Sequence, residues 1–166
     1  VNSSLFHLRY TFGTLCEPSD TVYTLNVEKV LELDISNACF ATGVALESGK
    51  TYHLSVAGTV VNDGSYVADA NGIKEPGLSM YMAIPLRRHV TKPWINLFAR
   101  IGHDGNDNYV LSVGSNEITA RSDGELFLYV NDAVFGVWPQ WDLPYIWQGG
   151  ENVGSIAVAI DAVPDE

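Results

Sequence analysis

The sequence is poor in basic residues and in long apolar runs, and each shortage excludes a class of protein. Nine lysine and arginine residues stand against 20 aspartate and glutamate residues, so the formal net charge of the 166-residue chain is −11. This balance argues against a nucleic-acid backbone or an anionic membrane as the main partner. No stretch reaches the roughly 18 apolar residues of a membrane span. An acidic surface favours solubility and is also compatible with cation binding.

Only two cysteines, Cys16 and Cys39, occur in the sequence. They permit one disulfide without requiring it. Cys39 lies between Ala38 and Phe40, a setting in which a buried free thiol is the expected state. The two cysteines do not decide whether the protein is secreted or cytoplasmic.

Residues with the spacing of a catalytic or metal centre are also missing. The four histidines lack His-x-x-x-His spacing, and no Gly-x-Ser-x-Gly segment marks a nucleophile. The polar run 104–108 begins like a calcium loop but lacks its turn glycine and terminal glutamate, so we expect a hairpin turn. The only basic cluster, Arg87-Arg88-His89 with Lys92, is expected to be a solvated loop. We therefore expect no enzyme, with a small hydrolase as the minor alternative.

The sequence does contain a repeated alternation of apolar and polar side chains, which predicts β-strands. The alternation covers residues 31–35, 52–60, 95–101, 126–130 and 156–160. Clusters of glycine, asparagine, aspartate and serine separate these segments and predict turns. Many short strands at this spacing predict an all-β fold, an antiparallel β-sandwich.

The length suggests one domain with its own core. Residues 1–34 differ in organisation, with strand candidates at 5–12 and 22–33 around a turn at 17–20. We divide the chain into an N-terminal segment, 1–34, and a β-sandwich domain, 35–166. The N-terminal segment is either an extra sheet edge or a remnant of a preceding domain. The initial valine suggests a processed product or a piece of a longer protein.

Oxygen-bearing side chains follow one predicted strand and open another. The strand 124–130 ends in Asn131-Asp132, and the last strand opens with Glu151-Asn152. Calcium takes about six to eight oxygen ligands, and a sugar diol can supply two of them. The pattern therefore predicts a calcium-assisted sugar site. The alternative is a turn at Asp132 and a capping role for Asn152, since both residue types favour turns.

The loop 135–148 between these positions holds three of the four tryptophans. Trp138, Trp141 and Tyr145 are candidates for stacking on pyranose rings, because tryptophan is often used at binding hot spots. The alternatives are packing against the sandwich, contact with another domain, and contact with a membrane surface.

Several short motifs keep a common order from Thr42 to Ile160. They are the segments 48–58 (ending in Ala-Gly), 75–78, 98–102, 129–132 and 151–158. In this order and spacing the chain resembles the calcium-dependent, galactose-binding bacterial lectins of the PA-IL type. The resemblance implies a jelly-roll type of β-sandwich.

The resemblance also implies a set of site residues. Asp132 matches the family's calcium-binding aspartate, and Glu151 and Asn152 match its amide pair. The loop at Asn62 and Asp63 matches an upstream main-chain carbonyl. Asn131 and Asp63 flank these positions and are candidate ligand contacts. The loop 135–148 is longer than in the family, and 74–77 lacks the family's sugar-contacting histidine and glutamine.

We therefore expect a non-catalytic carbohydrate-recognition module with calcium as its cofactor, an accessory domain of a longer bacterial protein. The alternative is a structural, docking or targeting domain that uses loop 135–148 without binding sugar. The partner is accordingly a carbohydrate or a neighbouring domain, and an oligomer is compatible with either. The glycan and the compartment stay open.

Overall fold

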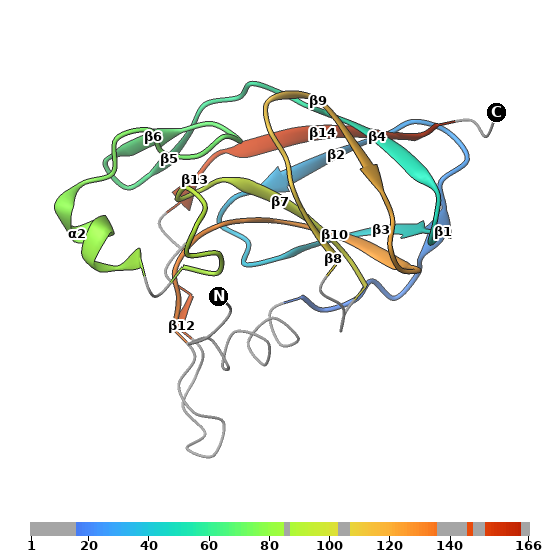
Figure 1. Cartoon of the computed structure of the whole chain (residues 1–166), viewed down its shortest axis with the longest axis horizontal. Helices are drawn as coiled ribbons and strands as arrows, with labels where there is room; N and C mark the ends of the chain where they lie inside the picture. The colour runs from blue at the N-terminus through green and yellow to red at the C-terminus, as the bar shows by residue number, and fades with distance from the viewer. Residues whose placement is uncertain (1–15, 85–86, 103–106, 136–145, 148–151, 164–166) are drawn as a thin grey trace, which may run out of the picture.

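The computed structural model describes residues 16–84, 87–102, 107–135, 146–147 and 152–163. Two large β-sheets face each other, and a small sheet lies at one end of them (Figure 1). The predicted β-sandwich is confirmed. Its described strand pairs are antiparallel except for one parallel pair, in which Tyr23 lies opposite Val44.

The five-stranded sheet has the order β1 (Tyr23–Thr24), β3 (Phe40–Leu46), β10 (Gly124–Val130), β7 (Leu97–Ile101) and β8 (Asp107–Val110). The four-stranded sheet has the order β2 (Lys29–Asp34), β14 (Ser155–Ala162), β4 (Thr51–Val56) and β9 (Gly114–Thr119). The small sheet has the order β13 (Asn152–Val153), β5 (Val61–Asp63) and β6 (Tyr66–Ala68). A two-stranded ladder joins β11 (Val134–Phe135) and β12 (Ile146–Trp147), and α2 spans Leu78–Met82. No helix in the described part of the chain is long and apolar enough to cross a membrane.

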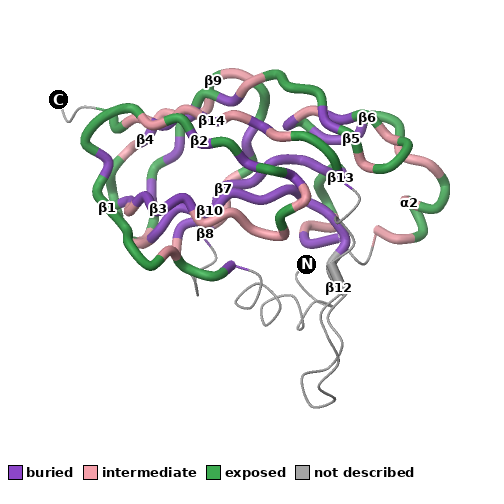
Figure 2. The backbone as a smooth tube through the Cα atoms, turned by 180° about the vertical axis from the view of Figure 1, so that it is seen from behind, coloured by how far each residue is buried: buried purple, intermediate pink, exposed green. Residues whose placement is uncertain are grey.

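The core lies between the two large sheets and is built from residues of their strands. Figure 2 shows buried residues along these strands. Fully buried side chains include Leu126, Leu128 and Val130 of β10 and Ile156, Val158 and Ile160 of β14. Burying each such side chain stabilises the fold by about 1.5–3 kcal/mol. The alternation that predicts the strands is therefore also what builds the core.

The last predicted strand is broken at Gly154. This glycine has φ +122°, a conformation that side-chain-bearing residues rarely adopt, and a Cβ there would lie 3.0 Å from Val61 Cγ1. The break separates β13 from β14. As a result β13 leaves the four-stranded sheet and pairs with β5 at the end of the sandwich, which brings Asn152 to that end.

Residues 16–34 supply an edge strand to each large sheet. β1 pairs with β3, and β2 pairs with β14 along its length, with Leu31 and Leu33 buried in the core. The first predicted strand candidate, 5–12, lies outside the described residues. The division of the chain at residue 34 stays a prediction.

The expected free thiol at Cys39 is wrong, because Cys39 forms a disulfide with Cys16. The two Cα atoms lie 5.0 Å apart, within the range of native disulfides. Cys16 packs with Phe98, Phe127 and Tyr129 in a second apolar cluster on the five-stranded sheet. Residue spacing could not reveal this pairing, since it depends on the chain returning alongside β3.

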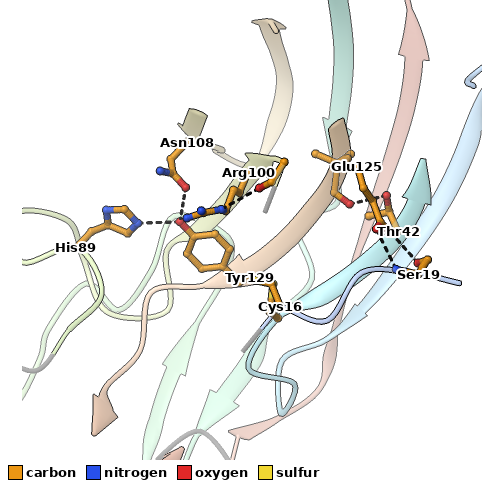
Figure 3. Close-up of a disulfide and its surroundings, with 11 residues drawn as sticks. Cys16, Ser19, Thr42, His89, Arg100, Asn108, Glu125 and Tyr129 are labelled. Carbon is orange, nitrogen blue, oxygen red and sulfur yellow. Dashed lines mark hydrogen bonds between the residues drawn. A yellow bond between two sulfur atoms is a disulfide. The ribbon is translucent and has the colours of Figure 1, made fainter. Parts of the chain in front are cut away.

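Glu125 attaches the segment after Cys16 to the same sheet. Its Oε1 accepts hydrogen bonds from Ser19 Oγ (2.6 Å) and the Gly43 N–H (2.8 Å), and its Oε2 accepts the Ser19 N–H (2.9 Å). Figure 3 shows this contact beside the disulfide. The N-terminal segment is therefore held by a covalent bond and by a buried carboxylate.

Candidate functional site

Asp132 and Asn152 contact each other although they lie 20 residues apart in the chain. Asn152 Nδ2 donates to Asp132 Oδ2 over 2.9 Å, and Asp132 Oδ1 accepts the Ala133 N–H over 2.6 Å. Only 5% of Asp132 and 3% of Asn152 is exposed. The fold thus brings the two main candidate ligands together, while their role as ligands stays a prediction.

Asn131 fixes the loop beside Asp132. Its Oδ1 accepts the His89 N–H over 2.8 Å. Its Nδ2 lies 2.8–3.1 Å from three carbonyl oxygens, those of His89, Lys92 and Pro93. Because the side chain is fully buried and already bonded within the protein, a ligand would have to compete with these bonds to contact Asn131.

The main chain around Asn131 is held on both sides. Its N–H donates to Asn96 O, and its carbonyl accepts the Ile95 N–H, each over 2.9 Å. Ile95 has φ +62°, and it is the one non-glycine residue with positive φ in the described part of the chain. A β-branched residue in this conformation costs about 1–3 kcal/mol and persists only where the surroundings hold it. This strain also explains why the predicted strand 95–101 begins at Leu97.

The small sheet separates the side chains of Asn62 and Asp63. Asn62 lies opposite Val153 and Val67, and these three residues are exposed. Asp63 lies opposite Asn152 in the antiparallel ladder. Because directly opposite residues point to the same face, the side chain of Asp63 is on the inner face with Asn152, and that of Asn62 is on the outer face. Only the main chain of Asn62 is left for its predicted part in the site.

A two-residue turn fixes Asp63. β5 and β6 pair with Asp63 opposite Tyr66, so Gly64 and Ser65 form the hairpin loop. Gly64 has φ +56° and Ser65 has no positive φ, which matches a type II′ turn. The loop expected at Asn62 and Asp63 thus begins at Gly64, and Asn62 and Asp63 belong to the strand β5.

Arg87 and Arg88 of the basic cluster are buried, so the expected solvated loop is wrong for these two residues, while Lys92 is exposed. Arg87 donates through its guanidinium to Lys92 O and Val90 O and lies over the Trp94 ring. Arg88 is 5% exposed, and its main-chain N–H donates to the main-chain carbonyl of Asp132 over 3.3 Å. These contacts arise because Asn131 folds the loop back onto the sheet.

Arg88 also changes the charge around Asp132. Burial lowers the pKa of Arg88 to about 10, while the electrostatic interactions with Tyr129 and Asp132 act in the opposite direction. The guanidinium therefore stays charged at neutral pH. It offsets part of the negative charge of Asp132.

A second polar cluster lies on the outer side of the five-stranded sheet. His89 Nε2 and the Tyr129 hydroxyl are 2.8 Å apart, and Tyr129 donates to Asn108 Oδ1 over 3.1 Å (Figure 3). Burial, followed by the charges of Arg88, Arg100 and Lys92, lowers the pKa of His89 to about 4. Burial also raises the pKa of Tyr129. Both groups are neutral at physiological pH, so the cluster is a hydrogen-bonded structural element.

The predicted hairpin turn at 104–108 joins β7 and β8, which pair with Ile101 opposite Asp107. Residues 103–106 lie outside the described part. The Asp107 carboxylate accepts hydrogen bonds from Arg121 and Ser122. Asp107 therefore anchors the neighbouring strand connection, as the hairpin reading expects.

The residues at Asp132 can be tested for their fit to a cation. Within the described ranges no three His, Cys, Asp or Glu side chains come together as a metal site. The Oδ1 of Asn152, however, is buried and has no hydrogen-bond donor among the described residues. A buried acceptor without a partner costs about 1–3 kcal/mol, and an oxygen-binding cation would satisfy it. A carboxylate and an amide oxygen are ligands that calcium accepts, so the pair fits calcium.

The remaining predicted site residues lie outside the described part of the chain. They are Trp138, Trp141 and Tyr145 of the aromatic loop and Glu151 beside Asn152. The ends of the loop are described, and they pair in register with Val134 opposite Trp147 and Phe135 opposite Ile146. The proposed stacking and docking roles of the loop stay predictions.

Sequence reasoning missed two buried charged residues, of which Arg88 lies beside the site and Glu125 holds the N-terminal segment. Glu125 lies in an apolar strand and Arg88 lies in a basic run, and both residues are buried. The charge of Glu125 in the predicted strand 124–130 was the one available signal, because an ionised side chain in such a strand needs partners if it is buried. The inward position of Arg88 had no sequence signal.

No family model and no curated protein matches the chain. Among solved structures, the EclA N-terminal domain, described as a PllA-like lectin, matches with a TM-score of 0.52 and 20% identity. The match covers 81% of this chain and 95% of that domain. A functionally unknown conserved protein mutant from Bacillus anthracis str. Ames matches with a TM-score of 0.41 and 13% identity, over 84% of this chain and 22% of that one, and this likeness supports no argument. At 20% identity the first likeness establishes the fold alone, and the chain therefore has a lectin-like fold.

Proposed function

We propose that this chain is a non-catalytic carbohydrate-recognition module in which calcium is held by Asp132 and Asn152. The observation that carries the proposal is the buried contact between these two side chains, 2.9 Å apart, in which Asn152 Oδ1 has no donor among the described residues. The lectin-like fold supports the choice of carbohydrate as the ligand class.

The burial of the two side chains favours a metal role over direct sugar contact. Less than a tenth of either residue is exposed, so neither offers a broad surface to a sugar ring. Calcium, when bound, would coordinate sugar hydroxyl groups. Asp132 would supply the charge, and Asn131 and Ile95 would keep its main chain in place.

Calcium binding is tested by thermal unfolding of the whole chain with calcium chloride or with EDTA. At a free concentration 100 times the Kd, calcium should stabilise the folded chain by about 2.7 kcal/mol, a rise in Tm of about 5–10 °C. Asp132→Asn should remove this rise. Asp161→Asn is the matched control, because Asp161 lies on β14 with an exposed side chain. An equal calcium response in wild type and Asp132→Asn would contradict the metal role.

Sugar binding is tested separately on a glycan array, in calcium and in EDTA. Binding in calcium alone supports both parts of the proposal. Binding in both buffers would leave a carbohydrate-binding module without a calcium site. A glycan array without binding, together with no effect of calcium on Tm, would contradict both parts of the proposal.

The second candidate is docking to a neighbouring domain. The helix α2 favours it, because Leu78, Tyr81 and Met82 are all exposed there. Three exposed apolar side chains in a five-residue helix form a surface that a partner could cover. This candidate would be the surviving one after a blank glycan array and a negative calcium test.

A further inference from the structure

The small sheet carries a row of polar residues on the face that bears Asn152. Asn152 lies opposite Asp63, and Asp63 lies opposite Tyr66. Burial follows the same alternation, since these three residues are buried or half-buried while Val153, Asn62 and Val67 are exposed. Directly opposite residues in an antiparallel pair have Cβ atoms about 4.5–5.5 Å apart. The Asp63 side chain is therefore an immediate neighbour of the Asn152 amide.

Asn152 has two acidic neighbours. Its Nδ2 bonds Asp132, and its cross-strand neighbour is Asp63. Its Oδ1, in a residue that is 3% exposed, has no donor in the described ranges. A buried amide oxygen that has no donor and two acidic neighbours indicates a cation site, because a cation can satisfy the oxygen where no hydrogen-bond donor does.

The charges around Asp132 show why a second carboxylate is needed there. The main-chain N–H of Arg88 donates to Asp132 O, and the guanidinium is close enough to offset part of the negative charge of Asp132. A single carboxylate beside a guanidinium has little net attraction for a divalent ion. A second carboxylate restores a net negative charge at the site, and affinity for calcium increases with ligand charge.

We propose that the Asp63 carboxylate is a second acidic ligand of the cation bound by Asp132 and Asn152. This inference rests on the calcium part of the proposed function. The antiparallel ladder of β13 and β5 places Asp63 opposite Asn152, and the turn at Gly64 places Tyr66 opposite Asp63. The residue that the register selects is thus Asp63, and the side chain of Asn62 is directed away from the ion.

The test uses terbium chloride as a luminescent probe and calcium chloride as its competitor, with the whole chain. Tyr66 is the next residue in the inner row, so its ring can sensitise terbium at this site. Asp63→Asn should weaken terbium and calcium binding about tenfold or more. The matched control exchanges the two residues, Asn62→Asp with Asp63→Asn. It keeps the net charge but moves the carboxylate to the outer face, because neighbouring strand residues point to opposite faces.

The expected result is that the exchanged variant loses as much affinity as Asp63→Asn, with both variants keeping the wild-type Tm in EDTA. Binding by either variant within twofold of wild type would overturn the inference. If Asp132→Asn abolishes binding while Asp63→Asn does not, the calcium part of the proposed function stands and Asp63 is not a ligand. If the wild-type chain binds neither ion, both the inference and the calcium site are wrong, and the glycan array still decides the carbohydrate role.

Discussion

Replacing Glu125 with glutamine tests whether a buried carboxylate holds the N-terminal segment on the sandwich. The two oxygens of Glu125 accept three hydrogen bonds, two from Ser19 and one from Gly43. Glutamine has the same shape but only one oxygen. Whichever way the amide turns, its NH2 group faces the N–H of either Ser19 or Gly43, and that N–H loses its acceptor.

The cost can be worked from these contacts. A buried donor without a partner costs about 1–3 kcal/mol, and the remaining hydrogen bonds lose the benefit of a charged acceptor. We expect Glu125→Gln to lower the free energy of unfolding by about 2–3 kcal/mol. For a chain of this length, that corresponds to a fall in Tm of about 5–10 °C.

Urea unfolding measures the free energy, and amide hydrogen exchange locates the effect. Protection should fall at the amides of Ser19 and Gly43 before it falls in the core strand β14. The matched control is Glu117→Gln on β9, where the side chain is exposed. A surface change of this kind should stay within about 0.5 kcal/mol of wild type.

The reasoning is refuted if Glu125→Gln unfolds at the wild-type urea concentration. It is also refuted if the loss of protection is spread evenly over both sheets. Either result would mean that the disulfide alone holds the segment, and that the three hydrogen bonds contribute no net stability.

Two further predictions concern pH and redox state. The pKa of His89 is lowered to about 4 in the fold, so between pH 6.5 and 4 the unfolded chain binds more protons and stability falls as the pH falls. The loss of stability from pH 7 to 4.5 should be about 2 kcal/mol smaller in His89→Gln than in wild type. The control is His53→Gln on β4, where the histidine is half-buried. A similar pH response in His89→Gln and wild type would show that His89 is not the group. The disulfide closes a sequence separation of 23 residues, so replacing Cys16 and Cys39 together with serine should lower the free energy of unfolding by about 3 kcal/mol. Dithiothreitol should destabilise wild type and leave that variant unchanged, and an unchanged wild type would contradict the structural role of the disulfide.

The β-sandwich could be predicted from the sequence because its signal is local. Leu31, Leu33 and Ile35 alternate with acidic neighbours within one segment, and this alternation reports which side chains are inside without reference to any other strand. The same local signal could not tell that β10 is buried on both faces, where Phe127 and Tyr129 pack in a second cluster. It also could not place Cys16 beside Cys39.

The candidate site was only partly accessible to sequence reasoning. The order of motifs pointed to Asp132 and Asn152, and the fold brings these two residues into contact. Asn131 was expected as a ligand contact, and its supporting role was not found, because it acts through a loop that comes from a distant part of the chain. A basic run such as 87–89 has the composition of a solvated loop, and only its folding over Asn131 and Trp94 buries it.

The sequence by itself determined where the strands lie, since apolar side chains recur at every second residue of each strand segment. Tertiary structure decided which side chains share a face at the end of the sandwich. The break at Gly154 sends Asn152 to β5, and the register of the β13–β5 ladder places Asp63 rather than Asn62 opposite Asn152. The physical reason is register, because a shift of one residue in pairing moves every side chain of a strand to the opposite face.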